Sequence, residues 1–190
     1  MDEADRYERA SAGFAAALRE VHPQQWTAPT PCAEWDVRAL VNHMTRGNLN
    51  YVALLAGATA ADFIRLRDAD ALGADPVAAY DASVRDCAHA FRAPGALDRM
   101  LDYPLGRARG GQLLAVRTTD SLVHTWDLAR AVGAPEALDP GLVAWAAASL
   151  EQTYAGLAGL ERFFAPAQPS EQPPAGDEQD RLLRRLGRCP

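Results

Sequence analysis

The sequence is short of cysteine and has no long apolar run, and each shortage excludes a class of protein. Its three cysteines, Cys32, Cys87 and Cys189, form no Cys-x-x-Cys pair, and neither a His-Glu-x-x-His motif nor a Cys-rich zinc pattern is present. The odd number of cysteines and the acidic, polar start of the chain (MDEADRYERA) predict reduced thiols in the cytoplasm and no secretory signal. No apolar run reaches the roughly 18–20 residues that a membrane span needs.

Basic residues are also fewer than acidic residues. The chain has 19 Lys and Arg residues against 25 Asp and Glu residues, a net charge of −6, which argues against a nucleic-acid-binding surface. Its 48% of hydrophobic and 23% of charged residues are typical of a globular protein. A length of 190 residues is enough for one domain with a sizeable core. We therefore expect neither a nucleic-acid partner nor a membrane partner.

Apolar residues at helical spacing run through most of the chain. They predict long helices over residues 5–21, 37–57, 76–91, 112–132 and 140–163, and short ones over 62–67 and 180–186. Asp36 is the expected N-cap of the second long helix, and Gly133 is expected to end the fourth. Residues 100–104 are a candidate extended segment, followed by a Gly/Arg turn. With no convincing sheet, the prediction is an all-α fold: an antiparallel four-helix bundle with additional short helices.

The C-terminal part of the chain differs in composition from the rest. Residues 165–176 contain four prolines and no periodicity, which predicts a surface tether. Leu182, Leu183 and Leu186 in the short helix after it are expected to dock on the bundle. The expected organisation is a bundle with its functional site over residues 1–164, and a Pro-rich tether with a docking helix over residues 165–190.

Asp120 and His124 lie four residues apart in the predicted helix over residues 112–132. At about 100° per residue, Asp120 falls in the middle of the apolar stripe of that helix, with His124 one turn further. A carboxylate there is costly unless it is paired or bound to a cation, and the neighbouring imidazole suggests a metal. His43, on the second long helix, is the candidate third ligand, which gives the donor set of a catalytic zinc site. Two alternatives stay open: a buried Asp120–His124 hydrogen bond, and a core histidine at His43.

Other residues are candidates for supporting roles, and no catalytic residue is assigned. Asp127 is a candidate second carboxylate that orients a ligating imidazole, with a salt bridge or a cap as the alternative. Arg46 and Arg117 are candidates to hold a substrate carboxylate near the metal, with a solvated charge as the alternative for each. Trp35 is expected to anchor the loop before the second helix. Cys32 is expected to be a small buried hydrophobe and not a nucleophile.

Three segments, TPCAEWDVRALVNHM, DSLVHTWDLARAVG and DRLLRRLGRCP, resemble the metal-binding DinB-like proteins of actinobacteria. The nearest group is that around the N-terminal domain of mycothiol-dependent maleylpyruvate isomerase. The resemblance covers nearly the whole chain and implies a four-helix bundle whose metal is held by His43, Asp120 and His124. The isomerase-type pattern has a Glu where this chain has Asp120. The implied cofactors are a divalent metal, zinc first with nickel or iron as alternatives, and mycothiol as a cosubstrate.

Three functions fit these residues at this point. The first is a metal-dependent transferase or isomerase-like enzyme that uses a low-molecular-weight thiol on an electrophilic small molecule. The second is a hydrolase that uses metal-activated water. The third is a non-catalytic metal-binding or interaction module, with a fourth protein ligand such as Asp127. The expected partners are a small-molecule substrate and the thiol, and a homodimer is considered because such bundles often pair through an apolar helix face.

Overall fold

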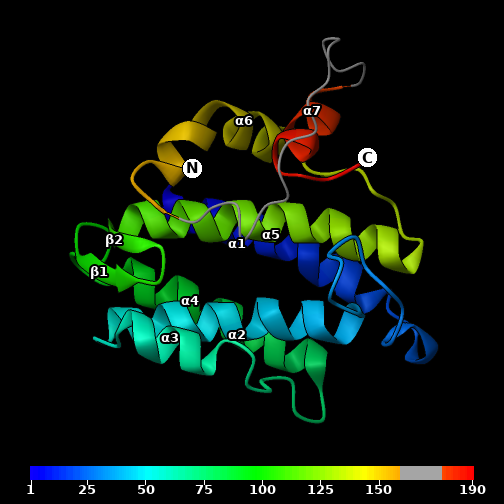
Figure 1. Ribbon diagram of the computed structural model, residues 1–190, viewed down its shortest axis with the longest axis horizontal. Coiled ribbons are helices and arrows are strands. Elements are labelled where there is room, and N and C mark those ends of the chain that lie inside the picture. Colours follow the sequence, from blue (N-terminus) through cyan, green and yellow to red (C-terminus); the bar gives the residue numbers. More distant parts are fainter. Residues whose placement is uncertain (159–176) are drawn as a thin grey trace.

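Four long helices form a ring in the computed structural model, which describes residues 1–158 and 177–190 (Figure 1). Helix α1 packs on α4 and α5, and α2 packs on the same two helices from the other side. The fold is therefore mostly helical. The bounds of the ring helices are α1 (Glu3–Arg19), α2 (Val37–Leu55), α4 (Pro76–Arg92) and α5 (Gly110–Val132).

Shorter helices connect and cover this ring. Most lie where helical spacing predicted them, but the last long helix, expected to reach residue 163, ends at Tyr154. Residues 155–158 are not helical, and the remainder of that predicted helix lies outside the described residues. The expected Pro-rich tether over residues 165–176 lies outside them as well. The additional helices are a 3₁₀ turn (Pro23–Gln25), α3 (Ala60–Leu66), α6 (Pro140–Tyr154) and α7 (Glu178–Arg185).

A β-hairpin precedes α5, and it corrects the all-α prediction. Strands β1 (Met100–Tyr103) and β2 (Gly106–Arg109) pair in antiparallel fashion, with Leu101 opposite Ala108. The segment expected to be a Gly/Arg turn is therefore a strand. Leu101, Tyr103 and Ala108 are buried while the residues between them are exposed or half-buried, which is the alternation of a strand with one face on the core. Strands of four residues are too short for this alternation to stand out in the sequence.

Side-chain caps explain why the long helices begin and end where they do. Asp36 accepts a hydrogen bond from the backbone N–H of Ala39 at 2.8 Å, as expected of the N-cap of α2. Asp75 accepts one from Ala78 at 3.0 Å at the start of α4. Gly133 ends α5 with a φ of 73°, a left-handed conformation that favours glycine. These local signals fix the registers of α2 and α5, and hence the faces on which their polar residues lie.

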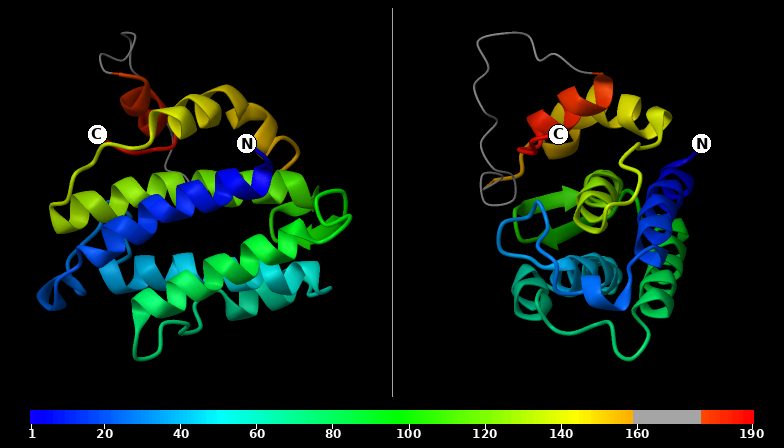
Figure 2. Two further views of the ribbon diagram at one scale, coloured as in Figure 1. Left: turned by 180° about the vertical axis from the view of Figure 1, so that it is seen from behind. Right: turned by 90° about the vertical axis from the view of Figure 1, so that its right-hand side faces the viewer.

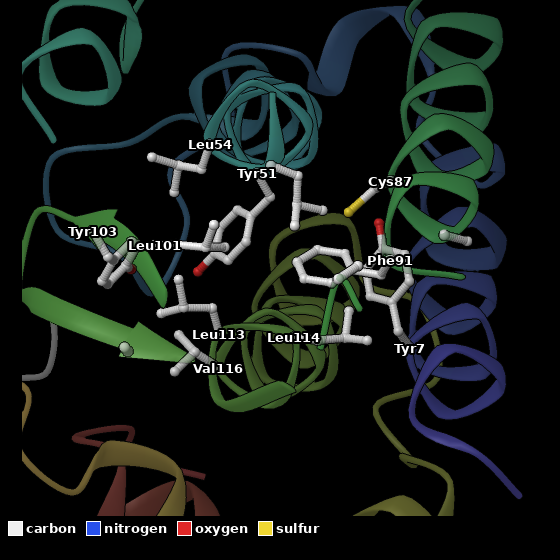
Figure 3. Packing of buried hydrophobic residues seen from close by; sticks show 14 of the residues in the cluster. Tyr7, Tyr51, Leu54, Cys87, Phe91, Leu101, Tyr103, Leu113, Leu114 and Val116 are labelled. Carbon is white, nitrogen blue, oxygen red and sulfur yellow. The ribbon is translucent and has the colours of Figure 1, made fainter. Parts of the chain in front are cut away.

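Helix α5 lies between the rest of the ring and the C-terminal helices. Helices α6 and α7 cover its outer side, away from α2 (Figure 2). Leu182, Leu183 and Leu186 are buried there together with Trp126 of α5. On the inner side, α5 shares with α2, α4 and the hairpin a second core region, shown in Figure 3. Polar side chains of α5 therefore have to find partners inside the protein.

Candidate metal centre

Four ionisable residues recur every three or four positions along α5. Arg117, Asp120, His124 and Asp127 therefore lie on one face of this helix. Arg117 and Asp127 are almost fully buried, and Asp120 and His124 lie in the wall of a cavity between them. This face is the structural frame of the candidate site.

The three predicted metal ligands come together at the cavity. Nε2 of His43 on α2 lies 4.0 Å from a carboxylate oxygen of Asp120, and the imidazole rings of His43 and His124 are centred 5.2 Å apart. One donor atom from each of the three residues lies within 4.8 Å of the donor atoms of the other two. Their role as metal ligands stays a prediction, but their convergence is the arrangement that it requires.

Asp127 fixes the orientation of His124. Its Oδ2 atom lies 2.8 Å from Nδ1 of His124, and the carboxylate has no exposed surface. Arg188, from the segment that follows α7, donates to both oxygens of Asp127 at 3.1 and 2.8 Å. Because Nδ1 is engaged by Asp127, Nε2 is the nitrogen left for a cation. The position of Asp127 fits the orienting role that the sequence predicted for it.

These contacts set the protonation of the two histidines. Burial lowers the pKa of His43 well below its ordinary value, and the nearby charges of His124 and Arg117 lower it further. Burial also opposes the charged form of His124, but its bonds to Asp127 and Cys32 outweigh this and raise its pKa to about 9. His43 is thus a neutral donor at physiological pH, whereas His124 must release a proton before it can bind a cation.

Arg117 departs from both predictions made for it. It is 1% exposed, so the alternative of a solvated charge is wrong. Its guanidinium donates to Asn48 at 2.7 Å, to the backbone carbonyl of Met44 at 2.6 Å and to Asp120 at 3.2 Å. With its nitrogens committed to protein acceptors, it positions Asp120 and is poorly placed to hold a substrate carboxylate. Asp120 therefore already has a cationic partner, and the cost of burying its carboxylate does not by itself call for a metal. The support for a metal is the convergence of the three predicted ligands.

Arg46 is not brought to the candidate site. Its guanidinium donates to the backbone carbonyls of Ala69 and Asp70, at 3.1 and 2.9 Å, and it is absent from the cavity wall. It ties the loop after α3 to α2. With its guanidinium committed to these carbonyls, Arg46 receives no support from the structure for a substrate-binding role.

Cys32 has polar neighbours, which corrects the expectation of a simple buried hydrophobe. Its Sγ lies 3.4 Å from Asp127 and 3.9 Å from Nδ1 of His124, and Arg188 reaches it at 3.6 Å. Cys32, His124 and Asp127 thus form a second group with metal-ligand spacing. The guanidinium of Arg188 already supplies the positive charge there, which opposes a metal cation at the same place.

The loop before α2 also shapes the site. The indole ring of Trp35 packs on the imidazole of His43, with their centres 4.5 Å apart. Trp35 thus restrains the His43 ring in addition to anchoring its loop. Sequence periodicity cannot predict this contact because Trp35 lies outside the helix.

A cavity of about 440 Å³ opens beside the three predicted ligands, a volume within the roughly 300–1,000 Å³ of small-molecule sites. Its wall carries the polar residues described above, together with Arg67. It also carries apolar and aromatic residues, among them Tyr51, Phe63, Tyr103, Leu105, Val116 and Tyr154. The wall therefore offers contacts both to a polar reactive group and to an apolar body of a ligand.

Comparison with known proteins places the chain in a family. The model of the mycothiol maleylpyruvate isomerase N-terminal domain matches residues 7–129, which include all three predicted ligands. The chain belongs to this family. It is a mycothiol-related, metal-binding family, in agreement with the resemblance seen in the sequence.

Two uncharacterized proteins of Mycobacterium tuberculosis, one from strain CDC 1551 / Oshkosh and one from strain ATCC 25618 / H37Rv, are each 36% identical to this chain. The matches cover 99% of this chain and 98% of each relative. These mycobacterial relatives fit the actinobacterial assignment. No solved structure matches the chain. Among the described residues, no helix is long and apolar enough to cross a membrane.

Proposed function

We propose that this protein is a divalent-metal-dependent enzyme that uses a low-molecular-weight thiol of the mycothiol type for transfer or isomerisation on an electrophilic small molecule. The observation that carries the proposal is the convergence of His43, Asp120 and His124 beside a cavity large enough for a small molecule. Membership of a mycothiol-related family supports the choice of thiol.

The donor set fits a catalytic metal. Two imidazole nitrogens and one carboxylate oxygen are typical of zinc sites that keep a position open for a ligand, with nickel and iron as the alternatives. The second nitrogen of His124 is held by Asp127, as is usual for a metal-ligating histidine. A bound divalent cation would supply Lewis acidity, which keeps a thiol deprotonated at neutral pH.

The residues around this donor set hold it in position. Arg188 bonds Asp127, which in turn bonds His124, while Arg117 bonds Asp120. Trp35 covers one face of His43. Since the thiol would come from a cosubstrate, the proposed reaction needs no cysteine of the chain as its nucleophile.

The two other hypotheses make different predictions. A hydrolase would use the same ligands but turn over without added thiol. A non-catalytic module requires a fourth protein ligand that closes the metal site. Asp127, the candidate for that ligand, is bonded instead to Nδ1 of His124 and to Arg188, which favours an open site. The cytoplasmic location and the homodimer stay predictions.

The test is the His43→Ala variant, compared with His89→Ala, which removes an exposed histidine of α4. We expect the wild-type protein and His89→Ala to bind about one equivalent of zinc and to show saturable mycothiol binding by calorimetry. His43→Ala should lose both properties and any thiol-transfer activity while its circular dichroism spectrum keeps the helical content. Full zinc and thiol binding by His43→Ala would refute the proposal.

A further inference from the structure

Asn50 is a polar residue of the cavity wall that the proposed reaction does not yet use. It lies on α2 two helical turns after His43, so its side chain leaves the helix within about 20° of the direction of His43. His43, Gly47 and Asn50 follow one another along this face, and all three line the cavity. At a rise of about 1.5 Å per residue, Asn50 lies about 10 Å along the helix axis from His43. A ligand that reaches from the candidate metal to Asn50 therefore needs a body several bonds long.

Most of the hydrogen-bonding capacity of the Asn50 side chain is unused. The residue is 3% exposed. Among the described residues, its side chain makes one hydrogen bond, from Nδ2 to the backbone carbonyl of Phe63 at 3.4 Å, which is longer than the usual N–H···O bond. A side-chain amide has two N–H donors and an oxygen that accepts two bonds. The carbonyl oxygen and the second N–H of Asn50 are therefore left for another partner.

The burial of this amide indicates the kind of partner that it binds. Buried polar side chains nearly always have a hydrogen-bond partner, because an unpaired polar group is costly away from bulk water. Since Asn50 lies in the wall of a cavity, a molecule in that cavity can supply the partner. The free carbonyl oxygen accepts hydrogen bonds only, so the ligand group opposite it must carry a donor, as a hydroxyl or an amide N–H does.

The most buried arginine residues of the wall are less available to a ligand than Asn50. The guanidinium of Arg117 bonds Asp120, and that of Arg188 bonds Asp127. Both groups hold residues of the candidate metal centre in place. The uncharged amide of Asn50 has no such task, so it is free to distinguish one ligand from another by a hydrogen bond.

We propose that Asn50 is a specificity-determining residue that binds a hydroxyl or amide N–H group in the body of the thiol cosubstrate while the sulfur of that thiol binds the metal. This inference rests on the proposed function and names the part of the thiol that the protein recognises. The hydroxyl or N–H group donates to Oδ1 of Asn50. A thiol whose donor group lies next to its sulfur is too short to make this bond, whereas a thiol with a longer polar body makes it.

The test uses two matched pairs of uncharged thiols, and in each pair the terminal oxygen carries either a hydrogen or a methyl group. The short pair is 2-mercaptoethanol and 2-methoxyethanethiol, and the long pair is the monothiol of triethylene glycol and its methyl ether. Dissociation constants are measured by NMR titration of the zinc-loaded, isotope-labelled protein. In the long pair we expect the hydroxyl thiol to bind about three- to tenfold more tightly, the effect of one neutral hydrogen bond, and in the short pair we expect equal binding. Equal binding within the long pair, or the same preference in both pairs, would overturn the proposal.

The Asn50→Leu variant assigns the preference to one amide group, and it should bind the two long thiols equally. Asn42→Leu is the matched control, since it removes an amide from the same helix that bonds the backbone of Ala69 and Ala71 and lies outside the cavity wall. The control should keep the wild-type preference. In the wild-type protein, the side-chain N–H signals of Asn50, identified by their absence from Asn50→Leu, should shift with the long hydroxyl thiol only. Retention of the preference by Asn50→Leu would refute the role of Asn50.

Zinc content and short-thiol binding, measured on the same samples, separate this inference from the proposed function. Wild-type protein, Asn50→Leu and Asn42→Leu should all hold about one equivalent of zinc and bind the short thiols with the same affinity. Normal zinc content and short-thiol binding, without a preference in the long pair, would overturn the Asn50 subsite alone. Absence of zinc from the wild-type protein, or of binding by any thiol, would overturn the proposed function and the subsite with it.

Discussion

Replacing Arg188 by Met should destabilise the whole fold, because it breaks an ion pair buried between the C-terminal segment and α5. The Arg188 side chain is 9% exposed and Asp127 is fully buried. Two hydrogen bonds, at 3.1 and 2.8 Å, would be lost. Removing one partner of a buried pair costs about 3–5 kcal/mol. Since Asp127 keeps its contact with His124, we expect about 3 kcal/mol, the low end of that range.

For a domain of this size, about 3 kcal/mol corresponds to a fall in Tm of roughly 6–12 °C. The assay is thermal unfolding of the metal-free protein followed by circular dichroism. Arg185→Met is the matched control, because Arg185 is 46% exposed and its contact with the exposed Glu151 is 4.0 Å long. Such surface pairs contribute about 0–1 kcal/mol, so the control should melt close to the wild-type protein.

A double variant tests whether the effect comes from the pair itself. Arg188→Met combined with Asp127→Asn removes both charges, so it should lose less stability than the sum of the two single variants. If Arg188→Met melts no lower than Arg185→Met, or if the two single effects simply add, the buried pair does not hold the C-terminal segment on α5.

Three further predictions follow from the same site. Asp127→Asn should weaken zinc binding about 10- to 100-fold in calorimetry, because His124 loses its anionic partner; unchanged affinity would contradict this. Gly47→Ala should lower the stability by about 1–3 kcal/mol, since its new Cβ would lie 2.7 Å from the anchored Arg117 guanidinium; an unchanged Tm would show that Arg117 can move. The pKa of Asp127 is lowered to about 2 from 3.8 and that of His124 is raised to about 9 from 6.5. The stability that Asp127 gives the metal-free protein is therefore lost as the pH falls through about 2, and that of His124 as the pH rises through about 9; Tm values that stay flat at both ends of the pH range would contradict this.

The helices could be predicted because their signals are local. The apolar spacing of α2 and α5, the Asp36 cap and the Gly133 stop all lie within a few residues of the positions that they determine. The hairpin was missed because four residues per strand carry too little alternation. The order of the long helices therefore followed from the sequence, but the presence of a sheet did not.

Asp120 and His124 could be recognised as neighbours from the sequence because they share one face of a single helix. The contacts between distant segments could not be found in this way. Cys32 and His124 are 92 positions apart, and Asp127 and Arg188 are 61 apart. No periodicity relates such positions, because only the docking of the C-terminal segment and the loop before α2 brings them together. The one signal for Arg188 is its place in the C-terminal block that carries the family resemblance.

The most direct test of the account is to locate the cation. Crystals of the zinc-loaded protein should give an anomalous peak at the zinc absorption edge, roughly 2.0–2.2 Å from Nε2 of His43, Nε2 of His124 and an oxygen of Asp120. A peak between Cys32, His124 and Asp127, or no peak near any of these residues, would contradict the central claim.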